Sequence, residues 1–438
     1  MIRAAFLLLT AGLILAFASL RYGAVLQADW YPCELALGVI LLLGYHPFGE
    51  SGESAPVNPV LCVCLLAIPA LALLQAVPVP ASWVGALSPG RMALANPLLR
   101  FAPAPTRLPL SIRPDETLRY ALRYLAFAAT FLMTRDLMWR LPGRQWLIAL
   151  PPLCIALFEA GIGVLQNSAG VATNMVSGTF MNRNHFSAML EMCLPFALCG
   201  VFDFAPEARR ALIACGGAVT ATLLLTGIGL SLSRTGYFIA LLVVLLMVWL
   251  HAMTRLRGAV RVFAVIAGLL TVVASGIALA SGMLLERMAS PANTTHSDVP
   301  FTDRLLFWKE TMHVMAAYPI FGCGFGAFVS AVTPWRAAAV TRTLDYAHND
   351  YLQFVAEGGI LAALFAIPIA VIVTRSIWRG VFRQRRAERR GFAIACGVAV
   401  VAGALHSAVD LITYVPATGM LLCWFVGMAA GLEFDQTP

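Results

Sequence analysis

Residues 236–252, GYFIALLVVLLMVWLHA, form an apolar run that stands between Arg234 and Arg255. The run is close in length to the roughly 20 residues that an α-helix needs to cross the hydrocarbon of a bilayer. Basic residues are typical of the two ends of such a helix, where they reach the watery interface. The stretch therefore predicts a membrane-spanning helix.

The same pattern recurs along the chain. Of its 438 residues, 60% are hydrophobic and 12% are charged, whereas an ordinary soluble domain is about a quarter charged. This composition excludes a soluble enzyme and predicts a polytopic membrane protein. We mark twelve apolar spans, at 4–20, 32–47, 59–78, 117–134, 145–166, 186–202, 211–230, 236–252, 262–284, 351–374, 391–413 and 416–432.

Arginine positions predict the orientation, because short cytoplasmic loops retain positive charge during insertion. If the N-terminus is inside, the even-numbered connections between spans are cytoplasmic. All of these connections carry arginines except 48–58. The first span resembles a signal peptide, but eleven spans follow it, so we expect a retained helix. The inner arginines are Arg135, Arg140 and Arg144; Arg209 and Arg210; Arg255, Arg257 and Arg261; and Arg375, Arg379, Arg383, Arg385, Arg386, Arg389 and Arg390.

We therefore expect an all-α polytopic protein with about twelve transmembrane helices and both termini inside. It forms a single integral-membrane domain over 1–438. Two long connections, 79–116 and 285–350, are expected on the outer face. The second, between spans nine and ten, is predicted to contain an amphipathic helix, followed by a tight turn at the glycines of 322–326.

The net charge of +8 does not indicate a nucleic-acid partner, because the basic residues lie between apolar runs. The arginine-rich run 375–390 is expected to orient the chain and to contact anionic lipids on the cytoplasmic side. The ten cysteines lack metal-ligand spacing and are interpreted as small buried hydrophobes. We expect no metal and no cofactor.

Two polar clusters open spans on the outer face. The first contains Asn182, Arg183, Asn184 and His185, and the second contains Arg234 among small residues. A guanidinium binds phosphate oxygens through two hydrogen bonds and keeps its charge, so the pair suits a diphosphate. The alternative is that each arginine reaches to the interface without binding a ligand.

A third cluster closes the late outer loop. If the tenth helix begins just after His348, then Asn349, Gln353 and Glu357 form one polar stripe along it. His348 at its watery end could accept a proton, or it could cap the helix. Asp410, expected inside the eleventh span, requires either His348 or an outer arginine as a partner.

Two further sets of charged residues are open to more than one interpretation. Glu159 and Glu191 fall inside predicted spans and could pair with arginine or mark a proton path. Glu116, Arg119 and Arg123 share one helical face and form either a structural ion-pair set or part of a diphosphate site. The chain has no nucleotide-binding Gly-rich loop ending in Lys and no Asp-x-Asp pair, so activation must come with the substrate.

Taken together, these motifs resemble the O-antigen ligase and polymerase family of bacterial inner-membrane proteins. The resemblance rests on Asn-Arg-Asn-His at 182–185, Ser-Arg at 233–234, the run from Arg304 to Gly326, and His348-Asn followed by Glu357-x-Gly359. It implies transfer of a glycan from undecaprenyl diphosphate to an acceptor sugar hydroxyl at the periplasmic face, without metal or nucleotide.

The resemblance also implies residue roles. His348 matches the family's catalytic histidine, and Arg183 and Arg234 match its outer arginines, with Asn182, His185, Asn349, Glu357 and Asp410 in support. A ligase that joins O-antigen to lipid A–core is favoured. A polymerase that joins lipid-linked repeat units, a protein O-glycosylating transferase and a transporter without chemistry are the alternatives.

Overall fold

The protein is a bundle of long helices in a computed structural model that describes residues 2–44, 55–56, 58–97, 106–170, 176–202, 208–255, 301–336 and 345–436. The expected span 262–284 lies outside these described residues, as do the side chains of the arginines at 209, 210, 255, 257 and 261. The long bundle helices are α1 (Ile2–Leu20), α2 (Gln27–Gly44), α3 (Pro59–Ala76), α6 (Pro114–Arg140), α7 (Trp146–Ser168), α8 (Arg183–Phe202), α9 (Ala208–Ser231), α10 (Arg234–Arg255), α14 (Asp350–Phe382), α15 (Ala387–Ser407) and α16 (Pro416–Gly431).

Within the described ranges, nine helices are long and apolar enough to cross a membrane. They correspond to nine of the twelve expected spans. Two other expected spans, 32–47 and 117–134, fall on α2 and α6, which are helices but are not among the nine. α2 carries Asp29 and Glu34, and α6 carries charged residues near both ends. A multi-pass helical protein is thus confirmed, and the total of twelve spans stays a prediction.

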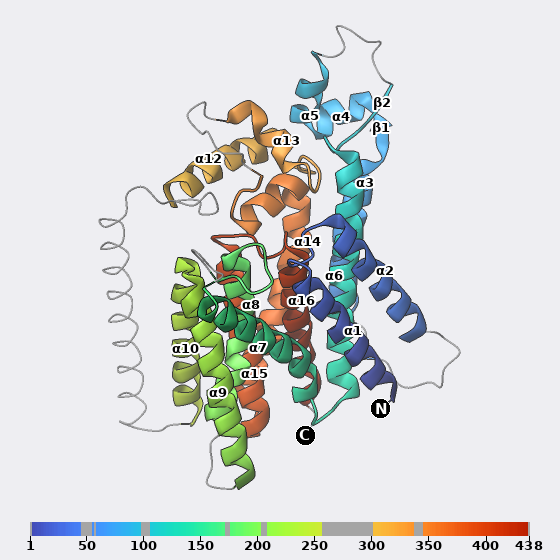
Figure 1. Cartoon of the computed structure of the whole chain (residues 1–438). Helices are drawn as coiled ribbons and strands as arrows, with labels where there is room; N and C mark the ends of the chain where they lie inside the picture. Colours follow the sequence, from blue (N-terminus) through green and yellow to red (C-terminus); the bar gives the residue numbers. More distant parts are fainter. Residues whose placement is uncertain are drawn as a thin grey trace.

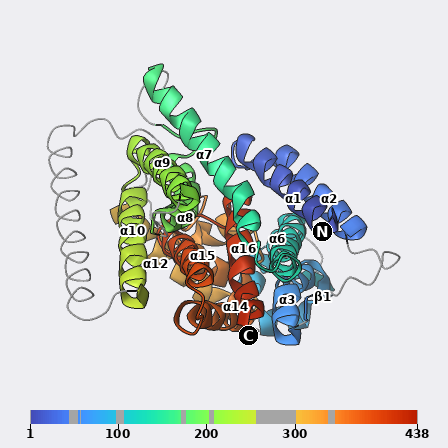
Figure 2. The same ribbon diagram turned by 90° about the horizontal axis from the view of Figure 1, so that it is seen from below.

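Three helices form the centre of the bundle. α8, α15 and α16 are mostly buried, whereas less than a third of the residues in the apolar stretches of α9 and α14 are buried, as expected for helices that face lipid. Seen along the bundle axis, α16 and α15 lie between α8, α6 and α14 (Figure 2). The polar segments before α8 and after α15 thus adjoin two of the most buried helices of the bundle.

Glycines let α16 approach α6 closely. A Cβ on Gly427 would lie 2.1 Å from the hydroxyl oxygen of Thr134, and one on Gly419 would lie 2.5 Å from the ring of Phe127. Because lipid tails are as apolar as leucine, membrane helices associate largely through such close backbone packing. This contact fixes the segment between α15 and α16 against the rest of the bundle.

The outer connections are folded over one end of the bundle. α12 (Phe301–Ala317), α13 (Phe328–Val332) and the 3₁₀ turn η2 (Thr333–Trp335) lie above α14, while α4 (Ala81–Leu87) and α5 (Pro89–Ala95) lie above α3 (Figure 1). The beginning of α1 and the turn η3 (Leu432–Gln436) lie at the opposite end. A helix in the late loop was expected, and α12 provides it. Its faces are mixed and not clearly amphipathic, because Leu305 and Met312 are exposed whereas Glu310 and Thr311 are buried.

The strictly all-α expectation is wrong in one detail. β1 (Pro78–Pro80) pairs antiparallel with β2 (Arg107–Pro109), with Val79 opposite Leu108. Proline fixes an extended backbone and cannot donate a hydrogen bond, so this proline-rich loop favours a short ribbon over a helix.

α14 is interrupted at Gly359, and the turn that contains the glycines of 322–326 packs against this interruption. Gly359 has φ 66° and ψ −169°, so the backbone amides and carbonyls around it lose their helical partners. The amides of Cys323 and Gly324 donate to the carbonyls of Ala356 and Glu357 at 3.0 Å each. The amide of Ile360 in turn donates to the carbonyl of Pro319 at 2.9 Å. The turn after α12 is thereby fastened to α14.

Candidate active site

The late outer loop and the end of α15 meet at His348 and Asp410. Nδ1 of His348 lies 3.1 Å from Oδ1 of Asp410. Nη2 of Arg304, from α12, lies 3.5 Å from Oδ2 of the same carboxylate, and its Nη1 donates to the carbonyl of Val409. Asp410 thus has both a histidine and an arginine partner, although the arginine is not one of the two expected from the sequence.

Asn184 extends this cluster to two more helices. Its Nδ2 donates to Oδ2 of Asp410 at 2.7 Å, and its Oδ1 accepts from the hydroxyl of Ser233 at 2.8 Å. Ser233 also accepts from the amide of Gly236 in the first turn of α10. The beginnings of α8 and α10 and the segment after α15 are therefore tied together through one side-chain amide.

His348 has an unusual backbone conformation with φ +50°, which costs a non-glycine residue about 1–2 kcal/mol. Its ring faces that of Phe307 at 6.3 Å between centroids, and its side chain is 20% exposed. Such strained residues concentrate at functional sites. With Nδ1 bonded to Asp410, the ring directs its other nitrogen, Nε2, away from the carboxylate.

The sequence placed Asp410 inside a helix, but in the structure it lies outside one. α15 ends at Ser407, and the amides of Ala408 and Val409 bond three residues back, to the carbonyls of Leu405 and His406. Burial acts to raise the pKa of Asp410, but hydrogen bonding to His348 and the charges of His348, Arg304 and His185 hold that pKa well below its usual range. Asp410 is therefore an anion throughout the working pH range.

The polar stripe of α14 lies where the sequence placed it. Asn349 caps the helix by accepting from the amide of Leu352, and its Nδ2 donates to the carbonyl of Ala408. Gln353 accepts from the amide of Ala347 at 2.9 Å, and Glu357 accepts from the hydroxyl of Tyr414 at 2.8 Å. These residues hold the segments that carry His348 and Asp410.

The two outer arginines each begin a helix. Arg183 is the first residue of α8, whose first turn is capped by the side chain and carbonyl of Asn182. Arg234 is the exposed first residue of α10. Because helix N-termini carry partial positive charge, both guanidinium groups add to an already electropositive pair of helix ends.

The membrane-embedded acids have partners of different kinds. Glu191 binds Nδ1 of His406 at 2.9 Å, and both side chains are fully buried. His185, also buried, interacts electrostatically with Asp410, His406 and His348. Glu159 accepts two hydrogen bonds from Thr179. Among the residues that the structure describes, neither acid therefore pairs with an arginine, which was one of the two expectations.

The charged face at the start of α6 is built as an ion-pair set. Arg119 binds Glu116 at 2.8 Å. Arg123 donates to the carbonyl of Tyr414 at 3.2 Å and lies over the ring of Tyr120. These contacts support the structural interpretation of this face.

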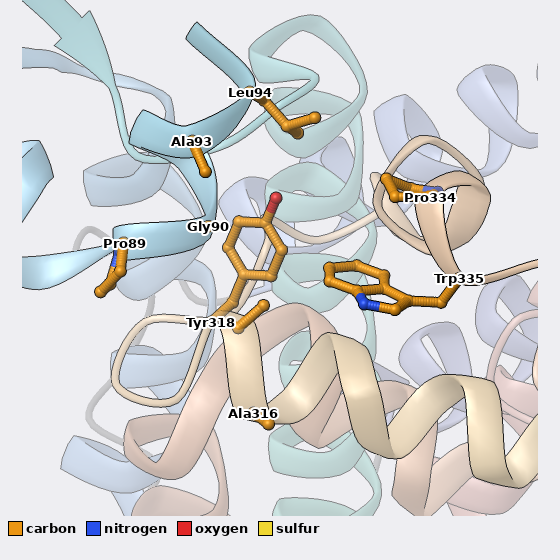
Figure 3. A pocket seen from close by; sticks show the side chains of 9 residues that line it. Pro89, Gly90, Ala93, Leu94, Ala316, Tyr318, Pro334 and Trp335 are labelled. Atoms are coloured by element: carbon orange, nitrogen blue, oxygen red, sulfur yellow. The ribbon is translucent and has the colours of Figure 1, made fainter. Parts of the chain in front are cut away.

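A separate pocket lies between the outer loops. Its volume is about 400 Å³, and Tyr318 and Trp335 project into the space below Ala93 and Leu94 of α5 (Figure 3). None of the residues of the His348 cluster lines it. The pocket is mostly apolar and joins α5 to the end of α12.

Sequence reasoning missed Arg304 and Phe307 as members of the site. Both lie on α12, far from Asp410 in sequence, so periodicity could not place them there. The available signal was a basic residue at the start of an amphipathic helix in an unusually long outer loop.

Residues 219–367 match a family model described as O-antigen ligase. The matched stretch contains Arg234, Arg304, His348 and Glu357, and it ends before Asp410. A comparison with curated proteins found no match. The match confirms the family resemblance that the sequence motifs indicated.

Proposed function

We propose, from its membership of the O-antigen ligase and polymerase family, that this membrane protein transfers a glycan from undecaprenyl diphosphate to an acceptor sugar hydroxyl at the periplasmic face. The family implies glycosyltransferase-type activity. The observation that carries the finer proposal is the bond between Nδ1 of His348 and the anionic Asp410. It sets the tautomer in which Nδ1 carries the proton and Nε2 has a free lone pair.

In this proposal, His348 is the general base. Nε2 takes the proton of the acceptor hydroxyl while the hydroxyl oxygen attacks the anomeric carbon. The bond from that carbon to the diphosphate oxygen breaks, and its electron pair leaves with undecaprenyl diphosphate. Attack on the side opposite the leaving group inverts the anomeric configuration.

Arg183 and Arg234 would bind the diphosphate. The hydrogen bond between Asn184 and Ser233 joins the two helix ends from which these arginines extend. Preorganised positive charge stabilises an anion that grows as the bond breaks, especially where water is excluded. The diphosphate brings its own activation, so we propose that the reaction requires neither a metal nor a cofactor.

The acceptor distinguishes two activities of the same chemistry. A ligase uses lipid A–core, which we favour, and a polymerase uses a second lipid-linked repeat unit. Transport without chemistry is less well supported, because His348, Asp410, Arg304 and Asn184 form one cluster instead of being spread through the depth of the bundle.

The test is transfer in detergent, with purified protein, lipid-linked glycan and each acceptor in turn. The wild-type protein should form product without a membrane gradient, and His348→Ala should lose it by at least about a hundredfold, because no base remains. Size-exclusion profile and thermal stability provide the control for folding. A fully active, folded His348→Ala protein would exclude His348 as the base.

A further inference from the structure

Glu159 is fully buried in α7, and the proposed transfer does not use it. Its Oε2 accepts from the amide of Thr179 at 2.9 Å, and its Oε1 accepts from the hydroxyl of Thr179 at 2.6 Å. Both carboxylate oxygens are thus directed at one residue of the segment before α8. A buried carboxylate is costly unless its oxygens are satisfied, so this arrangement indicates a defined task.

Gln166, two turns further along α7, forms hydrogen bonds with the same segment. Its Nε2 donates to the carbonyl of Gly178 at 2.6 Å, and its Oε1 accepts from the amide of Gly178 at 3.1 Å. Gly178 has φ +58°, and a Cβ there would lie 2.4 Å from Oε2 of Glu159. Only glycine allows the backbone to approach the carboxylate this closely.

The segment held by this clamp leads directly to the arginine assigned to the diphosphate. Phe180, buried, follows Thr179, and Asn182 then caps the first turn of α8, where Arg183 stands. Arg183 lies four positions after Thr179. A displacement of Thr179 therefore also displaces Arg183.

We propose that Glu159 is a positioning residue for the lipid diphosphate: together with Gln166 it clamps residues 177–179 and thereby holds Arg183 at the donor. This inference rests on the proposed function, because it assigns to Glu159 a role in binding the donor of the proposed transfer. It replaces the two earlier interpretations of Glu159, a partner for arginine and a proton path.

Replacement of Glu159 by glutamine distinguishes a role in hydrogen bonding from a role that requires a negative charge. In Glu159→Gln, the amide oxygen can still accept from the amide of Thr179. The amide nitrogen can donate to the hydroxyl of Thr179, whose own proton can go to the carbonyl of Ser19, 2.9 Å away. A clamp therefore tolerates glutamine, whereas a proton carrier or an ion pair does not.

The experiment measures the KM for lipid-linked donor and the KM for acceptor separately. Glu159→Leu should raise the donor KM on the order of tenfold with little change for the acceptor. Thr179→Val, which keeps the amide and loses the hydroxyl, should raise the donor KM less, and Glu159→Gln should stay close to wild type. Thr226→Val is the matched control, because it removes an exposed hydroxyl on α9 that bonds only within its own helix.

Binding of undecaprenyl diphosphate, measured by thermal shift, gives a readout that does not require turnover. Wild-type protein that binds this lipid but transfers no glycan would contradict the proposed function. The role of Glu159 would then be tested by lipid binding alone. An unchanged donor affinity in folded Glu159→Leu, or in Thr179→Val if the leucine variant does not fold, overturns the clamp. So does a Glu159→Gln protein as defective as Glu159→Leu.

Discussion

At the scale of single residues, the site depends on how Asp410 is held. Four groups surround its carboxylate: the imidazole of His348, the guanidinium of Arg304, the amide of Asn184 and the backbone amide of Leu411. A carboxylate that accepts this many hydrogen bonds remains ionised and stationary. It can therefore fix the histidine tautomer that the proposed reaction requires.

Asp410→Asn should lower turnover on the order of a thousandfold while leaving donor binding nearly intact. An asparagine amide can donate to Nδ1, which favours the tautomer with its proton on Nε2 and so removes the base. Steady-state kinetics with both substrates check this expectation. Loss of donor binding without loss of turnover would contradict it.

The pH dependence of stability has a definite sign at this residue. Because the pKa of Asp410 is lowered on folding, its contribution to stability is present above the ordinary aspartate range and is lost as the pH falls below it. The Tm of the wild-type protein should therefore fall between about pH 4 and pH 2 more steeply than that of Asp410→Asn. Equal slopes would show that Asp410 does not contribute.

Arg183→Lys tests whether the outer arginines bind an anion or only reach the interface. A lysine keeps the charge but cannot offer two parallel hydrogen bonds to a phosphate. We expect the KM for donor to rise on the order of tenfold, since a charge-assisted hydrogen bond is lost. Unchanged kinetics would return Arg183 to the interfacial interpretation.

At the scale of elements, the break in α14 connects the outer loop to the bundle. The helix is interrupted at Gly359, and the turn 319–324 supplies the missing hydrogen-bond partners. The side-chain amide of Gln75 from α3 also donates to the carbonyl of Glu357 at 2.8 Å. The position of His348 at the start of α14 is thus set from three parts of the chain.

Gly359→Ala should destabilise this junction. The backbone conformation at Gly359 is nearly restricted to glycine, and a Cβ would lie 2.1 Å from the carbonyl oxygen of Ile320. We expect a loss of at least about 2–3 kcal/mol in unfolding free energy, with a lower Tm and reduced activity. Gly216→Ala, at a helical position with open space around the Cβ, is the control and should not lower the Tm.

At the scale of the whole molecule, two sets of charged residues lie at opposite ends of the bundle. The outer set surrounds His348, whereas Arg383, Arg385 and Arg386 are exposed in the turn between α14 and α15, at the far ends of these helices (Figure 1). We propose that this turn faces the cytoplasm and contacts anionic lipids of the bacterial inner membrane.

The proposed orientation can be measured with reporter fusions. Green fluorescent protein at the C-terminus should fluoresce, because it folds in the cytoplasm, and alkaline phosphatase inserted after Asn96 should be active, because it folds in the periplasm. The reverse pattern would contradict the orientation predicted from the arginines.

The membrane class, the nine described apolar spans and the polar stripe of α14 could all be predicted from the order of residues. Hydropathy and helical period are local properties, readable over 20 residues. The same local information led to two errors. It extended the eleventh span past Ser407 to include Asp410, because the stretch 408–413 is apolar around that aspartate, and it gave no sign of the β1–β2 ribbon.

Which polar residues share a site depends on how the helices pack. Arg304 bonds to Val409, next to Asp410, across 105 positions of the chain, and Asn184 bonds to Asp410 across 226. Partners at such separations depend on how glycines let helices approach and on where backbone groups lack helical partners, as at Gly359. The sequence named His348, Arg183 and Asp410 as candidates. Packing supplied the contacts that support the roles proposed for His348 and Asp410, whereas the role of Arg183 comes from the family resemblance.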